Sequence, residues 1–122
     1  MNLIQTLRRI GQQMNGWRYG INMLNHQLII IKKLYTKHGL EIKLTCDACP
    51  EQYEVFKDGV QVAYYRLRHG EFRVDHPSCG DETIYEAEPL GDGMFYEKER
   101  LVYLTKALRC VLSKIQPLST SR

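Results

Sequence analysis

The amino-acid sequence predicts an α+β domain: a helical segment, then an antiparallel β-meander of about five strands, then a C-terminal amphipathic helix. Three observations predict this class. The hydrophobic period changes near residue 40 from helical spacing to alternation. Short turn sequences separate the alternating stretches, and Asp58-Gly59 and His69-Gly70 fit two-residue hairpin turns. Helical spacing returns in the last part of the chain, whose 122 residues have room for a single core.

Residues 1–38 are predicted to be a basic helical segment. Ten of its apolar residues follow one another at alternating steps of four and three, the repeat of a helical seam: Leu3, Leu7, Ile10, Met14, Trp17, Ile21, Leu24, Leu28, Ile31 and Tyr35. Glycines at positions 11, 16 and 20 weaken a helix, so we expect a break at residues 15–20 and two helices. The protein's own sheet or a second subunit must cover this seam, and we predict a homo-oligomer that buries part of it.

Residues 39–116 are predicted to hold the strands and the last helix. Alternating stretches lie at residues 40–44, 53–57, 60–68, 71–75 and 82–87. A loop rich in Gly and Pro follows at 88–93. Apolar residues then recur at helical spacing: Leu101, Leu104, Leu108, Val111, Leu112 and Ile115. Pro117 should end this helix and leave residues 117–122 as a flexible tail.

The turn at His69-Gly70 predicts a strand register. With two turn residues, Arg66 faces Arg73 across the hairpin. The same register puts the apolar residues of both strands, among them Leu67 and Phe72, on a single core face. The arginines therefore belong to the outer face.

Applied to Asp58-Gly59, the same rule predicts an apolar outer face at the other end of the sheet. It places Val55 opposite Val62 and Tyr53 opposite Tyr64. Such a face needs cover, so we expect the N-terminal helices or a partner to lie over it.

Charge is distributed unevenly along the chain, whose net charge is +3. Residues 1–40 contain no acidic side chain, and all 14 acidic residues lie from Glu41 onward. A basic front attracts nucleic acid or an acidic partner surface, although a solvated helix face explains the same pattern. Its candidate contact residues are Arg8, Arg9, Arg18, Lys32 and Lys33.

A patch of arginine and tyrosine is the best candidate site in the body of the domain. It comprises Arg66, Arg68, Arg73 and Tyr64. Like charges opposite each other destabilise a strand pair unless a carboxylate or an anion lies between them. An internal network with Glu71 and Asp75 is the explanation favoured by the sequence. The alternative is a partner- or anion-binding site, because arginine pairs with phosphate and with carboxylate groups.

The cysteines and a histidine form a pattern resembling a C2HC zinc site. Cys46 and Cys49 make a CxxC, and His76 and Cys79 an HxxC, which is the ligand spacing of structural zinc. Three predicted strands separate the two halves, however, and a strand of about six residues spans roughly 20 Å. We therefore expect no cofactor, with structural zinc as the alternative.

The sequence lacks the motifs of several classes of protein. The chain contains no P-loop, no dinucleotide-binding glycine motif, no HExxH and no nucleophile elbow, so we expect no enzymatic activity. It has no apolar run of the length that spans a bilayer. Its first residues do not read as a secretory signal, so a cytoplasmic location is expected.

Segments between residues 46 and 112 resemble a group of small proteins of bacteriophages and mobile elements. The resemblance rests on the stretch from Cys49 to Phe56, on the Tyr-x-Arg-Leu-Arg-His-Gly-x-Phe-x-Val motif that ends at Val74, and on Gly91-Asp-Gly-Met-Phe and Glu99-Arg-Leu. No activity is established for that group. The resemblance implies an accessory protein that binds a host component and blocks or redirects it, for example a defence or nuclease complex.

The sequence thus predicts a non-enzymatic binding protein that acts by stoichiometric contact with a host protein or protein complex. Two other hypotheses stay open. The first is a nucleic-acid-binding module that uses the basic front and the arginine patch, and the second is a small zinc domain.

Overall fold

A computed structural model describes residues 16–47 and 50–116, with side chains from residue 23 onward. The elements follow in the order α2 (Gly16–Lys37), β1 (Glu41–Asp47), β2 (Glu51–Lys57), β3 (Val60–Arg68), β4 (Glu71–His76), β5 (Glu82–Ala87) and α3 (Glu97–Ile115). The predicted α+β class is confirmed, as are the positions of the strands and of the last helix.

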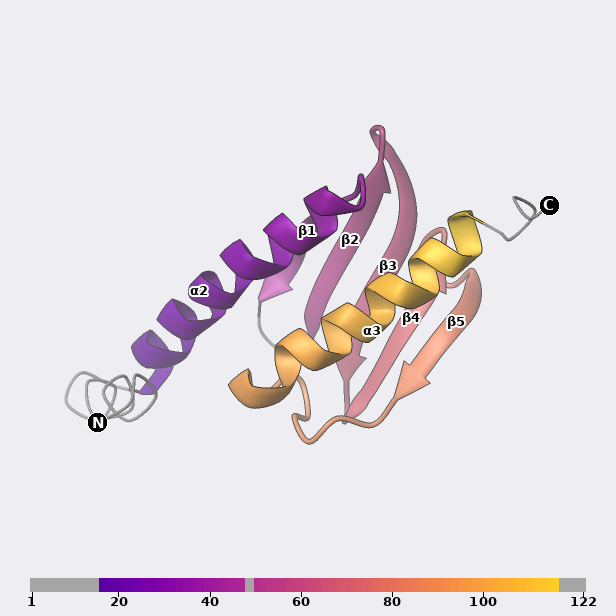
Figure 1. Ribbon diagram of the computed structural model, residues 1–122. Helices are drawn as coiled ribbons and strands as arrows, with labels where there is room; N and C mark the ends of the chain where they lie inside the picture. Colours follow the sequence, from indigo (N-terminus) through magenta and orange to yellow (C-terminus); the bar gives the residue numbers. More distant parts are fainter. Residues whose placement is uncertain (1–15, 48–49, 117–122) are drawn as a thin grey trace.

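The strands form one antiparallel sheet in the order β1-β2-β3-β4-β5, so each strand pairs with its neighbours in sequence. Both described helices lie on the same face of this sheet (Figure 1). There α2 packs beside β1 and α3, while α3 packs against β3 and β5. No described element covers the opposite face, which we call the open face.

The hairpin at His69-Gly70 has the predicted register. Both turn residues adopt positive φ, 54° at His69 and 75° at Gly70, as a two-residue type I′ turn requires. Arg66 accordingly pairs with Arg73, and Leu67 with Phe72.

The predicted register at Asp58-Gly59 is wrong by one residue beyond the turn. The turn itself forms, with φ of 51° and 81°, but a β-bulge follows it. Val55 pairs with Ala63 and Tyr53 with Tyr65, so Val62 is the extra residue. A one-residue shift exchanges the two faces of a strand. The bulge therefore puts Val55 and Tyr53 on the same core face as the next hairpin, so of the expected apolar pairs Tyr64 stays on the outer face without its predicted partner.

The core lies between the sheet and the two helices. Its aromatic centre is formed by rings that pack mostly edge to face: Tyr35, Tyr53, Tyr65, Phe72, Phe95 and Tyr103. The hydroxyl of Tyr35 lies 2.7 Å from that of Tyr65 and donates to the carbonyl of Leu104 at 2.7 Å. This pair of hydrogen bonds joins α2, β3 and α3 inside the core.

The described half of the N-terminal seam is part of this core. Leu24, Leu28, Ile31 and Tyr35 are buried against the sheet and α3. These residues are therefore covered by the protein's own chain. The side chains of the seam from Leu3 to Ile21 lie outside the described residues. The predicted break is wrong over residues 16–20, which form continuous helix with Gly16 and Gly20 inside α2.

A buried glutamate, Glu99, holds the loop between β5 and α3. Glu99 accepts hydrogen bonds from the backbone N–H groups of Leu90 and Gly91 at 2.8 Å and of Tyr96 at 3.0 Å. A Cβ at position 91 would lie 1.9 Å from the carbonyl oxygen of Met94, so only glycine fits there.

Candidate binding surfaces

The arginine patch lies on the open face, at the end of the β3–β4 hairpin. Arg66 and Arg73 are cross-strand partners, with Gln52 on the other side of Arg66 and Glu86 on the other side of Arg73. Side chains alternate along a strand, so these residues point away from the face that carries Leu67. The sheet thus presents a row of polar and charged side chains on the side away from the helices.

A hollow of about 230 Å³ opens beside this row. It is lined by Arg66, Arg68, His69, Glu71 and Arg73, and we call it the arginine hollow. All five residues belong to one hairpin, so its register and its type I′ turn determine how they are grouped. Four of the five are cationic or can donate a hydrogen bond from a ring N–H, and Glu71 is the exception.

Asp75 holds one of the arginines in place. Its carboxylate is 1% exposed and lies 3.2 Å from Nε of Arg73. The carboxylate also accepts hydrogen bonds from the backbone N–H of Gly80 at 2.9 Å and the hydroxyl of Thr83 at 2.8 Å. Two hydrogen bonds fix this buried carboxylate, and it attracts the Arg73 guanidinium as an ion pair in which Nε has no hydrogen-bond partner. The expected pairing of Asp75 with the patch is present.

The other half of the expected internal network is absent from the described residues. Glu71 lines the hollow but forms no ion pair there, and neither Arg66 nor Arg68 has a carboxylate within 4.0 Å in the described part of the chain. Two of the three arginines are therefore left with their charge uncompensated at contact distance.

Tyr64 lies on the same face of β3 as Arg66, two residues earlier. It is 8% exposed and donates a hydrogen bond to Oε1 of Gln52 at 2.9 Å. Burial, followed by the nearby Cys79, raises its pKa above the ordinary value of a tyrosine. The ring therefore stabilises the strands that carry the arginines and offers little surface for contact.

The candidate metal ligands do not come together. Cys46 is near the end of β1, whereas His76 ends β4 and Cys79 follows it in the turn before β5. Because β1 and β4 run in opposite directions with two strands between them, the last residues of β1 and of β4 lie at opposite ends of the strands. Cys49 lies outside the described residues. Across residues 16–47 and 50–116, no group of three or more His, Cys, Asp or Glu is placed to hold a metal ion.

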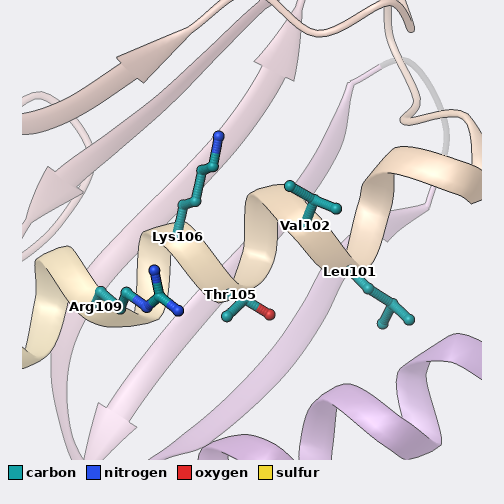
Figure 2. Close-up of a pocket in the computed structure, with 5 residues that line it drawn as sticks. All are labelled: Leu101, Val102, Thr105, Lys106 and Arg109. Atoms are coloured by element: carbon teal, nitrogen blue, oxygen red, sulfur yellow. The ribbon is translucent and has the colours of Figure 1, made fainter.

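A second surface lies on the solvent side of the helices. Leu101, Val102, Thr105, Lys106 and Arg109 of α3 line an open hollow of about 340 Å³. Figure 2 shows Leu101 on the side of α3 that faces α2, and Val102 and Lys106 on the other side. The hollow therefore combines an apolar part with two cationic side chains.

Basic residues are also exposed along the rest of this helical layer. From residue 23 onward the exposed cations of α2 and α3 are Lys32, Lys33, Lys37, Lys98, Lys106, Arg109 and Lys114. Only Lys114 forms an ion pair among the described residues, with Glu82 at 2.8 Å. In this range the helices carry two carboxylates, of which Glu99 is buried and Glu97 is partly buried. Of the other sequence candidates, Arg18 lies in α2 without a described side chain, and Arg8 and Arg9 precede the described residues.

Sequence reasoning missed the cations of α3. Val102, Lys106 and Arg109 are spaced by four and three residues, which places them on one helix face opposite the apolar residues. That spacing in the sequence indicates a cationic face on the last helix.

No protein-family model matches the chain, and neither does a curated protein or a solved structure. Neither described helix is long and apolar enough to cross a membrane. The function must therefore be inferred from the two surfaces.

Proposed function

We propose that this chain is a non-enzymatic binding protein, supplied by a phage or another mobile element, that modulates a host macromolecule by stoichiometric contact. The open face of the sheet is the proposed contact surface, and an acidic region of a host protein or protein complex in the cytoplasm is the proposed target.

One observation supports this most strongly: Arg66 and Arg68 lack an ion pair in the described residues, although they lie beside Arg73 on one hairpin. Opposed like charges on neighbouring strands cost roughly 0.2–1 kcal/mol. Anionic groups on a partner surface would remove that cost and accept charge-assisted hydrogen bonds from the arginines.

The surroundings of the arginines favour a shaped partner surface over indiscriminate attraction. Glu86 is the cross-strand neighbour of Arg73, and Glu54 lies on β2 beside Tyr64. These carboxylates would repel acidic groups that approach off register, and such repulsion contributes to specificity. A specific interface covers about 800 Å² on each partner, so the partner would extend beyond the hollow over the open face.

Affinity capture from host lysate tests this proposal. The full chain, an Arg66→Ala/Arg68→Ala variant and a Lys32→Ala/Lys33→Ala control would be used as bait. The control removes the same charge from the opposite side of the molecule. We expect the arginine variant alone to lose a partner that is recovered stoichiometrically, with both variants melting like the wild type. Equal recovery by all three baits would refute the open face as the contact surface.

A second candidate, nucleic-acid binding, is favoured by the exposed cations of α2 and α3, which far outnumber the one partly exposed carboxylate of these helices, Glu97. Phosphate contacts by lysine and arginine weaken steeply with salt. Binding of a labelled oligonucleotide would be measured across salt concentrations. A Lys106→Ala/Arg109→Ala variant should then bind more weakly and with a smaller salt slope, whereas Arg66→Ala/Arg68→Ala should not differ from the wild type.

A further inference from the structure

We propose that the arginine hollow binds a single phosphoryl group, the terminal phosphate of a phosphate monoester. This inference rests on the proposed function, since it names the chemical group that the open face recognises.

The number and type of donors favour phosphate over carboxylate. Arg66, Arg68 and Arg73 bring three guanidinium groups to one hollow, and His69 adds a ring N–H. A carboxylate has two oxygens, which a single arginine can pair with as a fork. A phosphate monoester has three terminal oxygens and a charge of about −1.5 to −2, so it can engage several arginines at once.

The local charge balance agrees with one such group. Three arginines face two carboxylates, those of Glu71 and Asp75, which leaves an excess of one positive charge. The Asp75 carboxylate is buried and occupied by its own partners, so it is not directed at a ligand. An arriving dianion therefore meets more cationic than anionic groups inside the hollow.

The hollow is too small and too closely bordered for an extended polyanion. At about 230 Å³ it is smaller than the roughly 300–1,000 Å³ of ordinary ligand pockets, so it suits a group rather than a whole molecule. The carboxylates of Glu54 and Glu86 lie on the flanking strands β2 and β5. A nucleic-acid strand crossing the sheet would pass over them and be repelled.

Part of the site is organised before any ligand arrives. Asp75 attracts Arg73 as an ion pair: Nε is buried and lies 3.2 Å from the carboxylate without a hydrogen bond to it, and none of the described residues forms a hydrogen bond with the terminal nitrogens of that guanidinium. Restraining a donor in the unbound protein lowers the entropy lost on binding. Asp75 is thus a positioning residue of the proposed site.

Two sources can present a phosphate monoester: a free small molecule, such as a nucleoside monophosphate, or a phosphorylated side chain of the protein partner. The test separates them. Isotope-labelled full-length protein would be titrated with inorganic phosphate, adenosine monophosphate, a phosphoserine peptide and its unphosphorylated form, and acetate, with amide shifts recorded by NMR.

We expect saturable shifts centred on residues 66–73 with the phosphorylated probes and inorganic phosphate, and none that saturate with acetate. The Arg66→Ala/Arg68→Ala variant should bind about tenfold to a hundredfold more weakly, because it loses charge-assisted hydrogen bonds. Lys32→Ala/Lys33→Ala should bind normally. Asp75→Asn should weaken phosphate binding. The amide spectrum of this variant checks that the rest of the fold is unchanged. Tighter binding of the phosphopeptide than of the free phosphates indicates a protein-borne group, and equal binding indicates a small ligand.

Three results would each overturn the inference. Acetate could bind as well as phosphate, or the shifts could remain in the arginine variant. The third is tighter binding of an oligonucleotide that has no terminal phosphate. Its failure is distinguishable from that of the proposed function. If the phosphate probes fail but the arginine variant still loses its lysate partner, the binding role stands and only the phosphoryl group is wrong. If phosphate binds but the arginine variant still recovers its lysate partner, the phosphoryl site stands and the open face is not the surface that contacts the partner.

Discussion

Arg100 on α3 and Glu51 on β2 form a two-pronged ion pair beneath the helical layer, with Nε 2.8 Å from Oε2 and Nη2 3.0 Å from Oε1. Arg100 also donates to Oε1 of Gln27 on α2 at 2.7 Å and to the carbonyl of Phe95 at 2.9 Å. Tyr53 donates a hydrogen bond to the same glutamate. The pair therefore connects both helices, the sheet and the preceding loop at a point that water does not reach.

Replacing Glu51 with Gln should destabilise the protein severely. The change leaves the Arg100 charge buried without its counter-ion, which typically costs about 3–5 kcal/mol. Urea unfolding would measure the loss. Glu82→Gln is the matched control, because its ion pair with Lys114 is exposed and should contribute about 0–1 kcal/mol. A Glu51→Leu/Arg100→Met double variant should lose less stability than Glu51→Gln. Equal losses in Glu51→Gln, Glu82→Gln and the double variant would contradict the role of Glu51 as the counter-ion of a buried Arg100.

Arg66 and Arg73 should differ in their effect on stability although they are cross-strand partners. Arg66→Ala removes an unpaired, half-buried cation and should change the free energy of unfolding by less than about 1 kcal/mol. Arg73→Ala removes a partner of the buried Asp75 carboxylate and should cost about 1–3 kcal/mol. Chemical denaturation of the two single variants checks this. Equal costs would show that Asp75 does not depend on Arg73.

Self-association is expected to depend on residues outside the described core. The buried seam residues such as Ile31 already pack internally, so Ile31→Ala should lower stability by about 2–5 kcal/mol without changing the subunit number. By contrast, deleting residues 1–15, or changing the exposed Ile29 and Ile30 to Lys, should yield monomers with nearly normal melting. Light scattering at high concentration measures the mass. If the full-length protein is monomeric at high concentration, the prediction of self-association is wrong.

Alkaline solution should unfold the protein. Burial raises the pKa of Tyr35, Tyr53 and Tyr65 above the ordinary tyrosine value. A folded-state pKa above the unfolded one gives stability that is fully present below about pH 10 and is lost as the pH rises further. Tyrosinate absorbance and circular dichroism, recorded together, should change at the same pH. Ionisation of all tyrosines before the loss of structure would argue against the burial of these hydroxyls.

Zinc should not be needed for the fold. Cys46 and His76 lie at opposite ends of the strands with β2 and β3 between them, far beyond the reach of ligands that lie about 2–2.3 Å from one ion. Elemental analysis of purified protein should find no stoichiometric zinc, and melting in a chelator should be unchanged. A melting temperature that falls in chelator and recovers with added zinc would reverse this conclusion.

The sequence by itself determined the elements and the β3–β4 register. Turn chemistry is local: His69 and Gly70 adopt positive φ in a two-residue turn, and that turn leaves one pairing for Arg66 and Arg73. Alternation and helical spacing likewise determined where the strands and α3 lie, because each pattern depends on neighbouring residues only.

Tertiary structure alone decided what those elements do together. The bulge at Val62 arises because both hairpins must present their apolar residues to the same helices, which no turn sequence encodes. Long-range packing also placed Leu28 and Ile31 in the core rather than between subunits. Finally, Asp75 pairs with Arg73 while Glu71 pairs with neither arginine, since an ion pair depends on side-chain position in three dimensions. Proximity in sequence predicted which charges were neighbours, but only the folded sheet decided which of them remained free to bind.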